Sequence, residues 1–169
     1  MVADATVQAE SAFVADLTRH RKVLLKVARV FCGNPADRDD LIQDITIHLW
    51  RGYASFDGRS QFSTWMYRVA LNVAISWTRS EITHRRRVKP TEQNEIDSIP
   101  AHEASEQRFL DQNFIETMLA ALPELDRALM LLHLEGHDHA TISDILGIST
   151  SNVATKLNRI KERLQQQFT

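Results

Sequence analysis

Apolar residues recur every three or four positions along most of the chain, which is the spacing of one face of an α-helix. The first such stripe predicts a helix over residues 7–31 that stops at Gly33, and its members are Phe13, Leu17, Leu24, Val27 and Phe31. Asn34 and Pro35 then form a start signal, because Asn caps a helix and Pro fits its first turn. A second helix is therefore expected, with an apolar face made by Leu41, Ile45 and Leu49.

The helical pattern breaks over residues 52–60 and resumes at about Gln61. A third helix is expected from there, ending in the basic run of residues 84–89, and its apolar side carries Met66, Ala70, Val73 and Trp77. A fourth stripe consists of Leu110, Phe114, Met118 and Leu122. Pro123 then opens a fifth helix that runs to Leu134, before Gly136. No segment shows the alternation of apolar and polar residues that is typical of a β-strand, so the predicted fold class is all-α.

Two short helices, residues 138–146 and 150–167, are predicted at the end of the chain. Gly147 between them can take a left-handed turn, Ile148 can fill the corner, and Ser149 can cap the second helix. This arrangement predicts a helix-turn-helix unit, which reads DNA with its second helix. That helix buries one side through Val153, Leu157, Ile160 and Leu164. An ordinary helical hairpin with a solvated polar face is the alternative.

Length and composition exclude several classes of protein. A chain of 169 residues, 43% hydrophobic and 25% charged, holds one ordinary domain or two small ones and is not disordered throughout. No apolar run is long enough to span a bilayer. The first ten residues also lack the basic segment followed by an apolar segment that is typical of a secretory signal. We therefore expect a cytoplasmic protein without membrane insertion. The single cysteine, Cys32, excludes an internal disulfide and a cysteine-rich zinc site.

Charge is unevenly distributed behind a net charge of -2. Residues 1–90 carry 14 basic and 9 acidic side chains, whereas residues 91–111 carry 1 and 6. Residues 90–105 contain two prolines, several acids and few large apolar residues. This segment is therefore predicted to be a flexible acidic linker. The predicted organisation is a helical domain over residues 7–89, this linker, and a helix-turn-helix domain over residues 106–169.

Three motifs in this order resemble the bacterial sigma factors of the extracytoplasmic-function (ECF) group, which belong to the sigma-70 family and keep only regions 2 and 4. The resemblance covers residues 21–164, and its strongest stretches are Asp39-Asp-Leu-Ile-Gln-Asp-Ile, Phe56 to Ala70, and Leu122-Pro-Glu-Leu-Asp126 followed by Leu146-Gly-Ile-Ser149. It implies that residues 7–89 are region 2 and residues 106–169 are region 4. The implied function is a subunit that directs core RNA polymerase to specific promoters and helps open the minus-ten region, without being an enzyme.

The resemblance assigns roles to three groups of residues. It places contacts to core polymerase, through its beta and beta-prime subunits, at Asp40, Leu41, Gln43, Asp44, Ile47 and Trp50. It places contacts to minus-ten DNA at Phe56, Arg59, Ser60, Gln61, Phe62, Asn72, Arg79, Arg85, Arg86 and Arg87. Contacts to minus-35 DNA fall at Ser149, Thr150, Ser151, Asn152, Thr155, Lys156 and Arg159. The acids near residue 40 have a second role in favouring the start of a helix, and the aromatic rings Phe62 and Trp65 are alternatively core residues.

The resemblance further implies promoter DNA as a ligand, an anti-sigma factor acting in trans, and no cofactor. Two departures from the family pattern stand out. The third helix reads Leu71-Asn72 and Ala74-Ile75-Ser76, which leaves the minus-ten preference open. His133, His137 and His139 form a spacing that could bind a metal or sense pH, although such histidines also occur simply as surface residues.

Two other functions remain open from the sequence. The first is a helix-turn-helix transcriptional regulator whose front helices sense a ligand; such regulators normally act as dimers. The second is a metal enzyme that uses His133, His137 and Asp138.

Overall fold

The computed structural model of the chain describes residues 2–88 and 114–167. Its helices are α1 (Val2–Phe31), α2 (Pro35–Tyr53), α3 (Phe62–Val88), a short helix over residues 114–120, α5 (Glu124–Leu134), α6 (His139–Leu146) and α7 (Thr150–Gln167). No strand occurs within these two ranges. The predicted all-α fold class is therefore confirmed. The predicted acidic linker, residues 90–105, lies outside the described residues.

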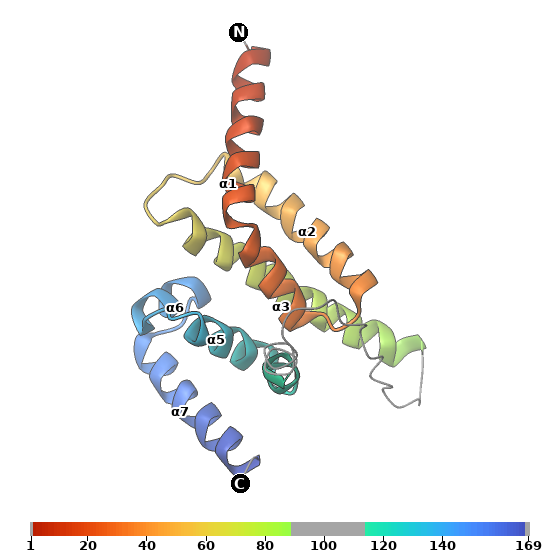
Figure 1. Ribbon diagram of the computed structural model, residues 1–169, viewed down its shortest axis with the longest axis vertical. Coiled ribbons are helices and arrows are strands. Elements are labelled where there is room, and N and C mark those ends of the chain that lie inside the picture. The colour runs from red at the N-terminus through yellow and green to blue at the C-terminus, as the bar shows by residue number, and fades with distance from the viewer. Residues whose placement is uncertain (1, 89–113, 168–169) are drawn as a thin grey trace, which may run out of the picture.

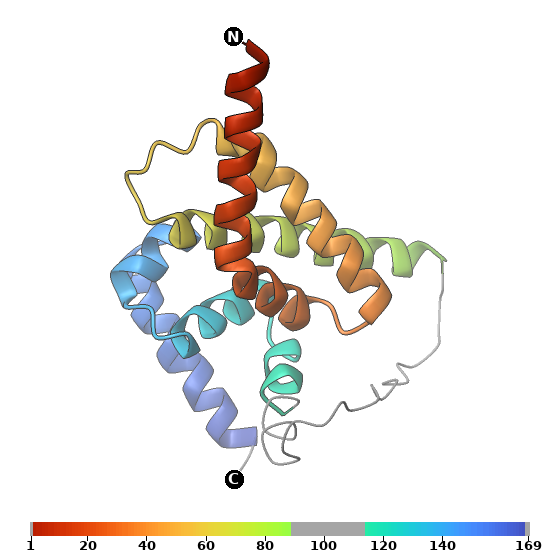
Figure 2. The same ribbon diagram turned by 45° about the horizontal axis from the view of Figure 1, so that its top comes forward.

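Helices α1, α2 and α3 pack together as a front bundle (Figure 1). The predicted stripes form its core: Leu41, Ile45 and Leu49 on α2 are fully buried, as are Met66 and Ala70 on α3. Helix α1 begins at Val2, earlier than the predicted residue 7, since residues 2–6 contain no glycine or proline to stop it. Both views show its first half projecting beyond the bundle (Figures 1 and 2).

The ends of α2 show one correct prediction and one error. Asn34 is the N-cap as expected, and its side-chain oxygen accepts a hydrogen bond of 3.1 Å from the Ala36 amide, with Pro35 in the first turn. Gly52 was expected to break the helix, but α2 continues through it to Tyr53. A Cβ at Gly52 would lie 3.1 Å from a ring carbon of Trp65. The glycine therefore makes room for the indole of α3 rather than ending α2.

Helices α5, α6 and α7 form the predicted helix-turn-helix unit. Asp138 caps α6 through a 2.8 Å hydrogen bond from the Thr141 amide, and this bond lowers the pKa of the Asp138 carboxyl. The Ser149 hydroxyl accepts a 3.2 Å bond from the Asn152 amide at the start of α7. Within the turn, the Ser143 hydroxyl donates to the Ile148 carbonyl at 2.5 Å. The predicted buried stripe of α7 is also confirmed, because Val153, Leu157 and Ile160 are at most 2% exposed.

The helix-turn-helix unit lies directly against the front bundle, which the sequence did not predict. Helix α3 contacts both α5 and α6, and α1 contacts α5 (Figure 2). Buried residues of both parts form one continuous apolar cluster. Among the described residues, no helix combines the length and the apolarity that crossing a bilayer requires.

The turn between α6 and α7 generates a prediction about stability. Gly147 has φ of +67°, a left-handed conformation in which a Cβ approaches the following carbonyl oxygen. Gly147→Ala is expected to lower the free energy of unfolding by about 1–2 kcal/mol, measured by urea denaturation. Gly33→Ala is the matched control, because that glycine has no positive φ and an added Cβ there meets nothing within 4 Å. Equal effects at both positions would contradict the role given to Gly147.

Candidate nucleic-acid and partner interfaces

One face of α2 presents acids and apolar side chains to solvent. Asp40, Gln43 and Asp44 are exposed, and Ile47 and Trp50 keep 42% and 40% of their surface accessible. The sixth residue predicted to contact polymerase, Leu41, is instead fully buried in the bundle. Leu41 therefore cannot touch a partner directly, and its role is to hold α2 against the core. The other five residues form a surface suited to a partner with basic and apolar groups, which we call the α2 face.

The part of α1 around the buried Phe13 supports this face, which sequence reasoning missed. The ring of Phe13 lies 5.1 Å from that of Trp50 and 5.1 Å from that of Tyr53, between ring centroids. The Tyr53 hydroxyl donates a 2.8 Å hydrogen bond to Asp16. Burial and the Asp16 carboxylate raise the pKa of Tyr53. The available signal was the position of Phe13 in the apolar stripe of α1, but the stripe does not reveal which residue of α2 it meets.

The loop between α2 and α3, residues 54–61, is anchored by aromatic rings. Phe56 contacts Phe62 at 5.6 Å and Trp65 at 5.2 Å, and Phe62 also contacts Tyr53 and His20. Phe56, Phe62 and Trp65 are each partly buried. Trp65 thus packs as a core residue, as one of the two interpretations expected. The rings of Phe56 and Phe62 also pack within this cluster, so they first of all shape the loop.

The tip of this loop carries the exposed polar groups. Gly58 has φ of +72°, which allows the sharp turn there. The Arg59 backbone amide and guanidinium both bond the Asp57 carboxylate, and these bonds lower the pKa of Asp57. Arg59 and Gln61 are exposed and Ser60 is half-buried. The loop therefore offers a guanidinium and an amide to a ligand beside a rigid aromatic base.

Helix α3 carries a polar stripe on its outer side. Arg68, Asn72 and Arg79 are all exposed, and at 100° per residue their directions fall within about 40° of one another. Arg68 was not among the predicted contacts, although its spacing from Asn72 could have indicated it. Arg85, Arg86 and Arg87 continue α3, but their side chains lie outside those that the structure describes.

The polar side of α7 faces away from the rest of the unit. Among the described helices, α7 contacts only α5 and α6, which leaves its outer side open. The predicted minus-35 residues on that side are exposed, and they are Ser149, Thr150, Ser151, Asn152, Thr155 and Arg159. We call these six residues the α7 face. Along this face, short hydrogen-bonding side chains come first and the cation Arg159 comes last. The former suit base edges and the latter suits a phosphate.

Lys156 differs from the other predicted residues of α7. Its ammonium lies 3.2 Å from a carboxylate oxygen of Asp126 in the first turn of α5, and both side chains are largely buried, 30% and 17% exposed. Its position on the helix places it beside the buried stripe rather than opposite it. In this structure the charge of Lys156 is already neutralised within the unit.

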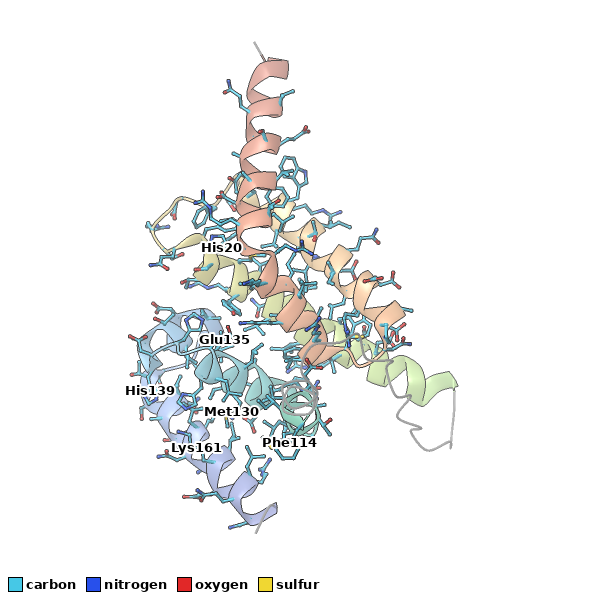
Figure 3. The ribbon with its side chains drawn as sticks, viewed as in Figure 1. His20, Phe114, Met130, Glu135, His139 and Lys161 are labelled. Atoms are coloured by element: carbon cyan, nitrogen blue, oxygen red, sulfur yellow. The ribbon has the colours of Figure 1, made fainter. Side chains whose placement is uncertain are left out.

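The three histidines do not assemble into a metal site. No group of three or more potential metal ligands occurs in the part of the chain that the structure describes. His137 meets Tyr67 of α3 edge-on at 5.2 Å. Burial lowers the pKa of His133, and the charges of Lys161 and His139 lower it further. Figure 3 shows His139 on the outer side of the helix-turn-helix unit.

Comparison with known proteins identifies both halves of the chain. The model for sigma-70 region 2 matches residues 17–83, and that for sigma-70 region 4 matches residues 115–164. The ECF RNA polymerase sigma factor SigG of Mycobacterium tuberculosis is 26% identical over 90% of this chain. The chain spans about half of that relative's length, 48%. RNA polymerase sigma factor YlaC of Bacillus subtilis is 29% identical, and the match covers 77% of this chain and 76% of the length of YlaC.

Solved structures share the fold. The sigma factor RpoE of Bartonella quintana, in complex with the anti-sigma factor NepR, superposes with a TM-score of 0.74 at 20% identity, covering 92% of this chain and 95% of that one. CnrH, in complex with the cytosolic domain of CnrY, gives a TM-score of 0.67 at 21% identity, covering 96% and 93%. With both family regions present in their expected order, the chain belongs to the ECF group of the sigma-70 family.

Proposed function

We propose that the chain directs core RNA polymerase to specific promoters and helps open the minus-ten region. The observation that carries this proposal is the open α7 face on a helix-turn-helix unit that matches region 4, in a chain whose front bundle matches region 2. Residues 7–89 serve polymerase binding and the minus-ten element, residues 106–169 serve the minus-35 element, and residues 90–105 connect them. The contribution of the chain is binding rather than catalysis.

The loop over residues 54–61 supports a role in opening DNA. Each base-pair step that opens loses about 1.4 kcal/mol of stacking. Capture of an extruded base offsets this loss, and polar groups on a rigid support are suited to hold one. Arg59, Ser60 and Gln61 supply those groups, and the rings of Phe56, Phe62 and Trp65 fix the backbone that presents them. Asn72 and Arg79 then lie along α3 to contact the duplex that follows.

Regulation by a partner in trans is the second part of the proposal. The solved structures of RpoE with NepR and of CnrH with CnrY are complexes with anti-sigma or cytosolic partner domains. We infer that a protein of the same kind binds this chain and competes for the α2 face.

Run-off transcription with purified bacterial core polymerase tests the proposed function. Templates drawn from a promoter library are expected to yield discrete transcripts only when core polymerase and this chain are both present. A chain that forms stable dimers, binds palindromic DNA and leaves transcription by core polymerase unchanged would instead be a helix-turn-helix regulator, and the proposal would be wrong.

The α2 face generates a prediction about polymerase binding. Asp44→Lys is expected to weaken binding to core polymerase by about tenfold, because a cation would then face a basic partner surface. Titration of labelled chain with core polymerase measures this change. Glu162→Lys is the matched control, since it makes the same change of charge on α7 and should leave that affinity within twofold. Equal losses in both variants would show that overall charge, not the α2 face, governs docking.

The pair of Asp126 and Lys156 generates a prediction about DNA binding by α7. Asp126→Asn releases the Lys156 ammonium to a phosphate, so the dependence of log affinity on log salt is expected to steepen by about 0.9. Binding to a short duplex over 50–200 mM salt, a range over which such contacts respond strongly, measures the slope.

Two controls separate this effect from general charge. Glu162→Gln changes the net charge equally but removes no partner of a lysine among the described residues, so its slope should match the unmodified chain. Adding Lys156→Met to Asp126→Asn should restore the original slope. A steeper slope that persists in this double variant would refute the role given to Lys156.

A further inference from the structure

We propose that helix α1 positions the loop over residues 54–61 for the capture of an extruded base, through Asp16 and His20. This role rests on the function proposed above and deepens it, because it gives α1 a part in promoter opening. Two side chains one helical turn apart on α1 contact the two ends of the loop. We call Asp16 and His20, together with Tyr53 and Phe62 that they contact, the loop anchor.

The two ends of the loop lie close together. Tyr53 is the last residue of α2 and Phe62 is the first residue of α3, and the centroids of their rings lie 6.1 Å apart in an edge-to-face arrangement. The intervening residues 54–61 therefore leave the bundle and return to it at nearly the same point, as in a compact surface loop. The placement of these two rings thus sets the course of the loop.

Helix α1 contacts both rings from one side. The Tyr53 hydroxyl donates a 2.8 Å hydrogen bond to the Asp16 carboxylate. The ring of His20 lies 5.4 Å from that of Phe62, between centroids. Figure 3 shows His20 where α1 passes the start of α3. Because side chains four positions apart lie on the same side of a helix, a single turn of α1 bridges the end of α2 and the start of α3.

The hydrogen bond between Tyr53 and Asp16 is suited to hold a fixed geometry. All four residues of the loop anchor are half-buried, which limits competition from water. A hydrogen bond to an ionised acceptor is also stronger than one between neutral groups. Burial and the Asp16 carboxylate raise the pKa of Tyr53, so its hydroxyl keeps the proton that it donates.

Packed rings connect the loop anchor to the polar groups of the loop. Phe62 packs against Trp65 at 5.4 Å and against Phe56, a residue of the loop itself, at 5.6 Å. Gln61 directly precedes Phe62, and its carbonyl accepts a 3.1 Å hydrogen bond from the Trp65 amide. The orientation of the Phe62 ring therefore governs that of Gln61, a side chain proposed to contact the extruded base.

Base capture requires this support because it depends on precise placement. Groups that bind a ligand have to be held within about 0.5 Å of the productive geometry, and loops hold them less precisely than helices do. Arg59 and Gln61 are exposed, and Gly58 between α2 and α3 adds backbone freedom. The loop anchor supplies, from a neighbouring helix, the rigidity that the loop itself lacks.

Asp16 and His20 are not the residues that hold α1 in the bundle. Leu24 and Val27 are buried in the core and do so, whereas Asp16 and His20 lie at its edge. Their replacement is therefore expected to leave the bundle folded and to act on the loop. Phe13 is less suited to a test, because its ring also packs against Trp50 of the α2 face.

Promoter opening by the full chain with core polymerase tests the loop anchor. A promoter duplex recovered in the run-off assay carries 2-aminopurine in place of a minus-ten adenine, and its fluorescence rises when that base unstacks. Asp16→Ala and His20→Ala are each expected to slow this rise by about fivefold, since each removes one contact. Asp16→Asn keeps an acceptor oxygen and His20→Phe keeps a ring, so both should restore the rate to within about twofold.

Two further measurements separate positioning from a general defect. Affinity for core polymerase should be the same in every variant. Run-off transcription from the same promoter with its minus-ten bases already unpaired should differ by less than about twofold, because no base has to leave a duplex. Glu10→Ala removes an acid at an exposed position of α1 and should behave like the unmodified chain. Circular dichroism verifies folding, and Tyr53→Phe, which removes only the hydroxyl, replaces Asp16→Ala if that variant unfolds.

Folded variants that open the duplex as fast as the unmodified chain would overturn the loop anchor. So would equal losses on the paired and the unpaired template, or rates that stay low in Asp16→Asn and His20→Phe. These results leave the proposed function intact, since they compare variants of a chain that opens promoters. An unmodified chain that opens no promoter with core polymerase would refute the proposed function, and the loop anchor with it.

Discussion

Helix α3 has to satisfy two demands at once, and the rest of the structure depends on how it does so. Its inner side, with Met66 and Ala70, closes the core of the front bundle against α1 and α2. Its outer side carries the exposed polar stripe of Arg68, Asn72 and Arg79, and Arg68 also donates a hydrogen bond to the Asp144 carbonyl of α6. A helix buried on one side and polar on the other can exchange one polar partner for another without disturbing its core. The proposed contact of α3 with promoter DNA depends on this property.

Local structure was largely predictable because each signal acts over a few residues. Asn34 with Pro35 fixed the start of α2, and Gly147 with Ser149 fixed the turn of the helix-turn-helix unit. Apolar spacing likewise identified the buried sides of α2, α3 and α7. Gly52 was misread because its role depends on Trp65, thirteen residues away, whose ring needs the space that a Cβ would fill. Leu41 was assigned both to the buried stripe of α2 and to polymerase contact, and its burial agrees with the first assignment. Family likeness identifies a surface helix but not which of its residues point inward.

The contacts between the two parts of the chain could not be predicted in the same way. Lys26 and Glu135 are 109 positions apart, and neither residue belongs to a periodic pattern that reveals the other. The pair of Asp126 and Lys156 is similarly invisible in the sequence, where Lys156 looks like a free cation of the recognition helix. Some cations suited to DNA are thus bonded to oxygen atoms of the chain itself, namely Lys156, Arg59 and Arg68.

The most direct test of this account is a footprint of core polymerase on a promoter, made with and without this chain. The account predicts protection of both promoter boxes, and unpaired thymines in the minus-ten region that react with permanganate, only when the chain and core polymerase are both present. Protection and reactivity that core polymerase gives equally without the chain would contradict it.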